Sequence, residues 1–242
     1  MKFSVIIPAY NEEKYLPRLL ESINAARINY SGGRDLIEVI VADNDSTDRT
    51  AEVAAAHGAR VVTVTKRRIA AARNGGGRAA RGEILFFIDA DSAVHPQTFN
   101  AIEAAMNTGR YIWGVTGAKL ERKSFALGLT YCLCMPMVLL TGIDTGLSFC
   151  RRADFEAVGG YDENRLYAED VVFPLALRRL GRSRAQKSIR LPQVKALACT
   201  RKFDQFGDWH YFWMFSHAFK SLITWNWNDE KLAEEYWYNS GR

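Results

Sequence analysis

Two carboxylates, Asp89 and Asp91, follow directly on a run of apolar residues at positions 84–88. A short apolar run of this kind predicts a buried strand of a parallel sheet, and open α/β sheets bind ligands at the carboxyl ends of such strands. A turn after the strand would bring the two carboxylates together. With phosphate oxygens from a ligand, they would then form an oxygen-rich site for Mg²⁺ or Mn²⁺. The alternative is a solvated Asp-Ala-Asp-Ser turn that binds nothing.

Polar residues also follow the first two apolar runs of the chain, at 3–7 and 37–42. The segment after the first run is Pro8-Ala9-Tyr10-Asn11-Glu12, and the segment after the second is Asp43-Asn44-Asp45-Ser46-Thr47-Asp48. Because the carboxyl ends of parallel strands are neighbours, these residues are expected to share one crevice with the two carboxylates. Acids beside a metal, with aromatic and amide groups nearby, suit a nucleoside diphosphate.

The elements that position these residues alternate between strand and helix patterns. The expected strands are 3–7, 37–42, 59–64 and 83–88. Three helices are expected between them. The first covers 12–26, the second is capped by Ser46 or Thr47 and ends at 57, and the third covers 69–80. Further on, we expect helices at 96–106, 152–158 and 171–180 and strands at 111–117 and 146–151. The alternation predicts an α/β fold with a doubly wound, mainly parallel sheet and helices on both faces.

Composition and charge narrow the class of protein. The chain has 242 residues, 48% hydrophobic and 24% charged, which favours one large domain with an appendage. The net charge of +5 fits an anionic substrate or an acidic membrane surface. It is too small to indicate nucleic acid, and no run of interleaved basic and aromatic residues supports nucleic-acid binding.

The four cysteines lack zinc-site spacing and are expected to be buried free thiols in a reducing cytoplasm. The sequence enters its first apolar run directly after Met1 and Lys2, so we expect no signal peptide and a cytoplasmic protein. Peripheral contact with the inner face of the membrane is the alternative.

Two segments in the second half have an unusual composition: one lacks charged residues and the other is rich in aromatic residues. Residues 125–143 contain no charge, but Pro136 and several polar positions favour a buried helix or an interfacial segment over a membrane span. The aromatic-rich stretch from 203 onward predicts a helical tail that packs on the domain, contacts a membrane surface or forms a dimer interface.

Several motifs in the same order along the chain resemble those of family 2 glycosyltransferases with the GT-A fold. The matching stretches are Ser4 to Glu12, Val41 to Thr50, Ala72-Arg73-Asn74, Gly82-Glu83, Asp89-Ala90-Asp91, Gly159-Gly160-Tyr161-Asp162-Glu163 and Glu169-Asp170. Each motif is weak alone, but the ordered set is specific. The resemblance implies transfer of a hexosyl or N-acetylhexosaminyl group from a nucleoside-diphosphate sugar, with Mn²⁺ or Mg²⁺ as cofactor. The acceptor would be a saccharide, a lipid-linked molecule or a small metabolite.

The same resemblance implies roles for particular residues. The nucleotide-sugar-binding residues would be Pro8, Tyr10, Glu12, Asp43, Asn44, Arg73 and Asp89. Arg201 is a further candidate for this group from its own sequence context, apart from the resemblance. Asp91 would be the metal ligand, with Asp89 holding the metal or the ribose. Glu169 and Asp170 match the acidic pair whose second member is the general base. Asn44 stands where the family often has a second acid, so uracil cannot be assumed as the base.

The chemistry supports a base at Asp170, because an acceptor hydroxyl is a poor nucleophile until a carboxylate removes its proton. Helix capping or complementation of the helix dipole is the alternative role for Asp170. One base and a single displacement would invert the anomeric carbon, although a retaining mechanism stays open. Arg201 is expected either to reach the diphosphate or to lie in a solvated basic turn.

We expect a glycosyltransferase domain at 1–200, with a nucleotide-binding part at about 1–117 and an acceptor part at about 118–200, followed by a tail at 201–242. A nucleotidyltransferase is one alternative, but its Gly-rich or basic loop after the first strand is replaced here by Ala9-Tyr10-Asn11-Glu12. A catalytically silent nucleotide-sugar-binding module is the other.

Overall fold

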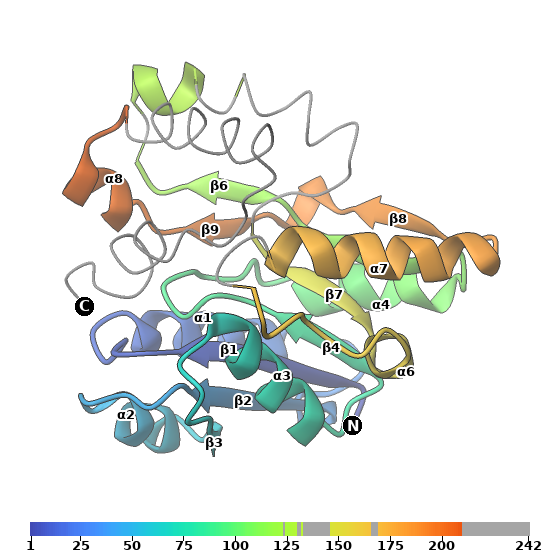
Figure 1. The fold of residues 1–242 in the computed structure, drawn as a ribbon, viewed down its shortest axis with the longest axis horizontal. Coiled ribbons are helices and arrows are strands. Elements are labelled where there is room, and N and C mark those ends of the chain that lie inside the picture. The colour runs from blue at the N-terminus through green and yellow to red at the C-terminus, as the bar shows by residue number, and fades with distance from the viewer. Residues whose placement is uncertain (123, 130–131, 133–145, 166–168, 210–242) are drawn as a thin grey trace.

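The computed structural model describes residues 1–122, 124–129, 132, 146–165 and 169–209 (Figure 1). Its first half contains β1 (Phe3–Ala9), α1 (Leu16–Ile28), β2 (Ile37–Asp43), α2 (Thr50–Ala56), β3 (Arg60–Thr63), α3 (Ile69–Ala79) and β4 (Ile84–Phe87). These elements confirm the predicted strand–helix alternation. The second half contains α4 (Thr98–Asn107), β5 (Tyr111–Val115), β6 (Ala118–Leu120), β7 (Ser148–Arg151), α6 (Arg152–Ala157), α7 (Glu169–Ser183), β8 (Lys187–Arg190), β9 (Ala196–Ala198) and α8 (Arg201–Phe206).

Seven strands form the main sheet in the order β3-β2-β1-β4-β7-β5-β8. β7 runs antiparallel to both of its neighbours, and the other strand pairs are parallel. The predicted mainly parallel α/β fold is therefore confirmed. The sequence analysis did not predict β6, β8 or β9. β6 and β9 pair with each other in a small parallel sheet. These strands are three or four residues long and half-exposed, so they carry no clear apolar run.

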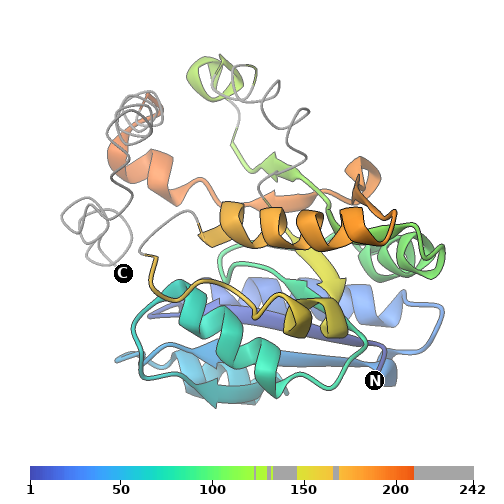
Figure 2. The same cartoon turned by 45° about the vertical axis from the view of Figure 1, so that its right-hand side comes forward.

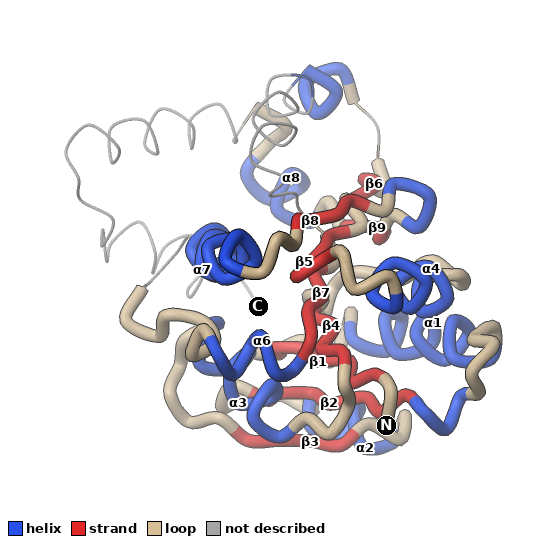
Figure 3. The backbone as a smooth tube through the Cα atoms, turned by 90° about the vertical axis from the view of Figure 1, so that its right-hand side faces the viewer, coloured by secondary structure: helices blue, strands red, loops and turns tan. Residues whose placement is uncertain are grey.

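Apolar side chains alternate between the two faces of the sheet and build a core on each. Val5, Ile7 and Phe86 pack on the face covered by α1 and α4, whereas Ile6 and Leu85 pack on the opposite face. Figure 3 shows α1 and α4 on one side of the sheet and α3, α6 and α7 on the other. In Figure 2, α7 (orange) and α3 (teal) lie on the same side. The period-two pattern of buried strands thus produces the doubly wound arrangement.

Side chains tie the loop after β1 to the loop after β2. The Ser46 hydroxyl accepts a hydrogen bond from the Asn11 amide, and the Asn11 side chain accepts one from the Thr47 amide. The prediction that Ser46 or Thr47 caps α2 was therefore wrong. The helix begins at Thr50, whose amide donates to the Asp48 carboxylate. Both loops are held at the same end of the sheet as a result.

Within the described ranges, no helix is both long enough and apolar enough to cross a bilayer. Most of 125–143 and the aromatic stretch after 209 lie outside those ranges, so the expectations for them stay predictions. Cys150 is buried, as expected, whereas Cys132 is exposed.

Candidate active site

A cavity opens at the carboxyl ends of β1, β2 and β4, next to the first residues of α7. The predicted site residues that line it are Pro8, Tyr10, Glu12, Asn44, Arg73, Asp89, Asp91, Glu169, Asp170 and Arg201. Asp43, the buried last residue of β2, is the one predicted site residue outside this lining. The structure therefore brings Asp170 into the same cavity as Asp89 and Asp91.

Arg73 from α3 joins two of these carboxylates. Its Nη1 lies 2.6 Å from Glu169 Oε1, and its Nη2 lies 3.0 Å from Asp89 Oδ1. The Glu169 side chain is only 8% exposed, whereas that of Asp89 is 53% exposed. Burial raises the pKa of Glu169, and the positive charge of Arg73 opposes this rise. Arg73 thus stabilises a buried carboxylate at one end and holds a solvent-facing one at the other.

Arg201, the first residue of α8, makes a second bridge. Its guanidinium binds both carboxylate oxygens of Glu12, at 2.8 and 2.7 Å, and lies 3.1 Å from Asp91. The side chain of Arg201 is 16% exposed, so the alternative of a solvated basic turn was wrong. This bridge closes one wall of the cavity by joining the loop after β1 to the loop after β4.

Asp170 stands in the first turn of α7, next to the buried Glu169. Its side chain opens toward the cavity, yet the surrounding protein reduces its hydration. This desolvation raises the pKa of Asp170, the negative charge of Asp89 raises it further, and Arg73 opposes both effects. A carboxylate with a raised pKa is a stronger proton acceptor once ionised. The geometry therefore suits a base that faces the cavity.

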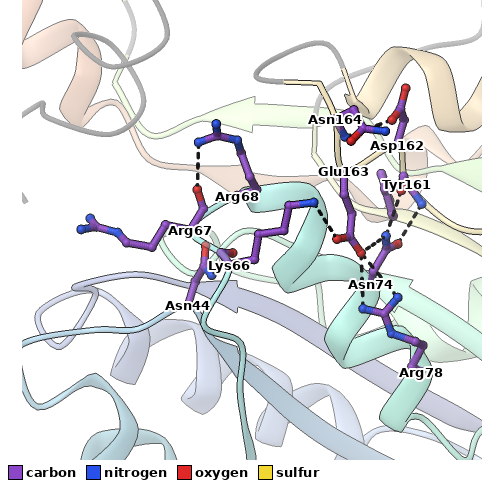
Figure 4. Close-up of polar contacts among 10 residues, drawn as sticks. All are labelled: Asn44, Lys66, Arg67, Arg68, Asn74, Arg78, Tyr161, Asp162, Glu163 and Asn164. Atoms are coloured by element: carbon purple, nitrogen blue, oxygen red, sulfur yellow. Dashed lines mark hydrogen bonds and ion pairs between the residues drawn. The ribbon is translucent and has the colours of Figure 1, made fainter. Parts of the chain in front are cut away.

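Arg67 lines the cavity and was missed by the sequence analysis. Its guanidinium lies 4.0 Å from the centre of the Tyr10 ring. The signal for it was the basic triplet Lys66-Arg67-Arg68, which directly precedes α3. Figure 4 shows Arg67 pointing away from the polar cluster around Glu163, while Lys66 points toward it.

The cavity lining contains five carboxylates and three guanidinium groups, an excess of negative charge that favours a bound cation. No group of three or more His, Cys, Asp or Glu side chains in the described part of the chain could hold a metal alone. Mg²⁺-type sites commonly use one or two carboxylates and take their remaining ligands from phosphates and water. Asp89 and Asp91 fit that incomplete donor set.

Comparisons with known proteins agree with this geometry. Residues 4–129 match the family model described as Glycosyl transferase family 2. The 4,4'-diaponeurosporenoate glycosyltransferase of Staphylococcus haemolyticus is 52% identical over 62 residues, which are 26% of this chain and 15% of that protein. The dolichol-phosphate mannosyltransferase of Pyrococcus furiosus is 34% identical over 136 residues, covering 52% of this chain and 37% of that protein. The chain thus spans less than half the length of these two relatives.

Two solved structures share the fold. S. aureus TarS 1-349 superposes with a TM-score of 0.65 at 22% identity, covering 84% of this chain and 61% of that chain. The mannosyltransferase PcManGT from Pyrobaculum calidifontis, in complex with GDP-Man and Mn²⁺, gives a TM-score of 0.65 at 24% identity, with 81% and 56% covered. At such identities the likeness establishes a common fold.

Proposed function

Because this chain belongs to glycosyl transferase family 2, we propose that it transfers a sugar from a nucleoside-diphosphate donor to an acceptor hydroxyl. The observation that carries the proposal is the shared cavity of Asp170, Asp89 and Asp91. It combines a base with two carboxylates that suit a diphosphate-bound cation. The structural relatives with bound UDP-GlcNAc and GDP-Man support a nucleotide sugar as the donor.

In this proposal each side of the cavity has its own task. Tyr10, Pro8 and Asn44 border the nucleoside, and Asp43 supports them from the end of β2. Asp89 and Asp91 would hold Mn²⁺ or Mg²⁺, which when bound would neutralise the charge that develops on the departing diphosphate. Arg201 would turn from Asp91 toward the phosphates when the donor arrives.

Asp170 would accept the proton of the acceptor hydroxyl as its oxygen attacks the anomeric carbon. A single displacement of this kind inverts the configuration at that carbon. Glu169 cannot share this task easily, because its carboxylate is buried against Arg73. We assign it the positioning of Arg73 instead.

A screen of nucleotide sugars by thermal shift, with and without Mn²⁺, identifies the donor base and sugar together. Asp91→Ala should remove the cation-dependent part of the donor affinity measured by calorimetry. Asp35→Ala, at a side chain that is 94% exposed, is the matched control. Equal donor affinity with and without Mn²⁺ in the wild type would exclude Asp91 as a metal ligand.

The same assays separate the alternatives. A nucleotidyltransferase would bind nucleoside triphosphates and release pyrophosphate. A silent binding module would bind nucleotide sugars without releasing the nucleoside diphosphate. Release of nucleoside diphosphate from a bound nucleotide sugar would exclude both.

We further propose a cytoplasmic protein with peripheral membrane contact near the acceptor part of the domain. Phe125 is 83% exposed and Trp209 is 56% exposed. Arg122 forms ion pairs with Asp204 and Asp208, which hold the segments of both aromatic residues together. Exposed aromatic side chains on two segments joined by ion pairs suit the interfacial region of a bilayer.

Sedimentation with anionic and neutral vesicles tests this contact. A Phe125→Ser, Trp209→Ser double variant should bind less than the wild type, whereas Ile28→Ser, at an exposed residue of α1, should bind equally. Wild-type protein that stays in the supernatant with every vesicle would refute the proposal.

A further inference from the structure

Asn74 of α3 binds the backbone of the segment 159–163, which comes before α7 in the chain. Its side-chain amide donates to the Tyr161 carbonyl, and its Oδ1 accepts from the Tyr161 amide, each at 2.8 Å. The side-chain amide also donates to Glu163 Oε1 at 2.9 Å (Figure 4). Asn74 is 3% exposed. This buried side chain therefore uses both its donor and its acceptor groups on one segment.

Glycine and charge support this contact. Gly160 has a φ of +74°, and a Cβ there would lie 2.5 Å from Asn74 Oδ1, so the close approach requires glycine. The hydrogen bond from Asn74 lowers the pKa of Glu163, and Lys66 and Arg78 lower it further against the effect of burial. The Glu163 carboxylate therefore remains a charged acceptor for the Asn74 amide.

The Tyr161 ring connects the bound segment to α7. It stacks on Phe173 with 4.1 Å between the ring centroids and 26° between the planes. Phe173 is 3% exposed and comes three residues after Asp170, which is about one helical turn. The Arg73 guanidinium lies 5.3 Å from the centre of the same Tyr161 ring. A shift of Tyr161 would therefore be transmitted to the start of α7.

Two neighbouring residues of α3 thus reach the start of α7 by different routes. Arg73 contacts the helix directly through its ion pair with Glu169, whereas Asn74 acts through Tyr161. We propose that Asn74 is a positioning residue that fixes Asp170 in the cavity. Asn74 itself is outside the cavity lining. The inference rests on the proposed function, in which Asp170 accepts the proton of the acceptor hydroxyl.

The expected effect follows from the geometry that a base needs. A base must lie within hydrogen-bond reach of the hydroxyl, and a displacement of about 1 Å can lower the rate by about 10²-fold. Asn74→Ala should therefore lower kcat for release of nucleoside diphosphate by about 10- to 10²-fold. The donor Kd measured by calorimetry should stay within about 3-fold of the wild type, because only the base moves.

Asn100 of α4 provides a matched control on the other side of the sheet (Figure 3). Its side-chain amide donates to the Asn29 carbonyl, and its Oδ1 accepts from the Ser31 amide. Asn100→Ala thus removes the same kind of contact between a helix and a remote backbone. It should leave kcat unchanged.

Hydrogen exchange tests the position of α7 without any turnover. Asn74→Ala should speed exchange of the amides at 173–180 by roughly 10-fold, because the contact that supports this helix is lost. The amides of α1 should exchange as in the wild type. Asn100→Ala should leave the exchange of α7 unchanged.

A rescue experiment separates positioning from a general loss of stability. Asn74→Asp keeps an acceptor for the Tyr161 amide but places a second carboxylate against Glu163. Adding Glu163→Gln supplies a neutral donor at that contact. The double variant should therefore raise kcat by about 5-fold or more over Asn74→Asp alone.

The outcomes distinguish this inference from the proposed function. If the wild type turns over no nucleotide sugar, the proposed function is overturned, and the exchange of α7 alone decides the role of Asn74. That role is overturned by unchanged exchange of α7, by unchanged kcat, by a matching loss of donor affinity, or by no recovery in the double variant. If circular dichroism shows that Asn74→Ala does not fold, Phe173→Leu replaces it. That variant removes the ring stacked on Tyr161, and it should lower kcat and speed exchange of α7 at unchanged donor affinity.

Discussion

Replacing Arg73 with methionine would leave the Glu169 carboxylate buried without the cation that it contacts. Removing one partner of a buried ion pair costs about 3–5 kcal/mol. The contact between Arg73 and Asp89 adds at most about 1 kcal/mol, because the Asp89 side chain is 53% exposed and screened by water. The expected loss for Arg73→Met is therefore about 3–5 kcal/mol, nearly all of it from Glu169.

Urea unfolding of a small set of variants measures this loss. Asp89→Asn should lower the free energy of unfolding by less than about 1 kcal/mol. The double variant Arg73→Met, Glu169→Gln should recover a large part of the loss, because no buried charge is left without a partner. In the single variant, the folded-state pKa of Glu169 lies above its unfolded value. The neutral form of Glu169 is favoured at low pH. The loss in free energy of unfolding of Arg73→Met relative to the wild type should therefore be smaller at pH 5 than at pH 8.

The result that would refute this reasoning is a loss below about 1 kcal/mol for Arg73→Met, since that is the range of an exposed pair. A double variant no more stable than Arg73→Met would also refute it. In that case the packing of the Arg73 stem, and not the charge of Glu169, would account for the destabilisation.

Two further predictions concern the sheet itself. Burial raises the pKa of Glu38, but the Ser4 hydroxyl, a backbone amide and Arg60 outweigh that effect and lower it. Glu38→Gln should therefore cost about 1–3 kcal/mol at pH 7. The carboxylate stabilises the fold above its unfolded pKa and loses this effect as pH falls through its folded pKa, so equal losses at pH 7 and pH 3 would contradict the account. A Cβ at Gly82 would lie 2.5 Å from the backbone of β1, so Gly82→Ala should lower the free energy of unfolding, measured in urea, by about 1–3 kcal/mol. Gly128→Ala, where a Cβ meets no atom within 4 Å in a helical stretch, should not lower the free energy of unfolding. A Gly82→Ala variant as stable as the wild type would show that the contact relaxes at no cost.

The strands that carry the site were predictable because their residues are apolar on both faces. β1, β2 and β4 stand close to their predicted positions, and the polar residues after them therefore converge as expected. The direction of β7 was not predicted, because an apolar run carries no information on strand orientation. β6, β8 and β9 were missed because pairing, and not local pattern, defines such short strands.

Side-chain partners were harder to predict than the site residues themselves. The ion pair between Arg73 and Glu169 joins residues that are 96 positions apart. Neither local propensity nor apolar periodicity specifies such a pair. Arg67 was missed for a related reason, since the basic triplet resembles an exposed turn until β1 places Tyr10 under it. The order of the motifs thus predicted which segments lie together at the site, but not which of their side chains pair with one another.

The turnover of Asp170→Asn, compared with its donor affinity, tests the central claim most directly. With the donor found in the nucleotide-sugar screen, release of nucleoside diphosphate should fall by about 10²-fold or more, because asparagine cannot accept the hydroxyl proton. Donor affinity should stay within about 3-fold of the wild type, since Asp170 is assigned no contact with the nucleotide. Near-normal turnover by this variant would contradict the assignment of Asp170 as the base.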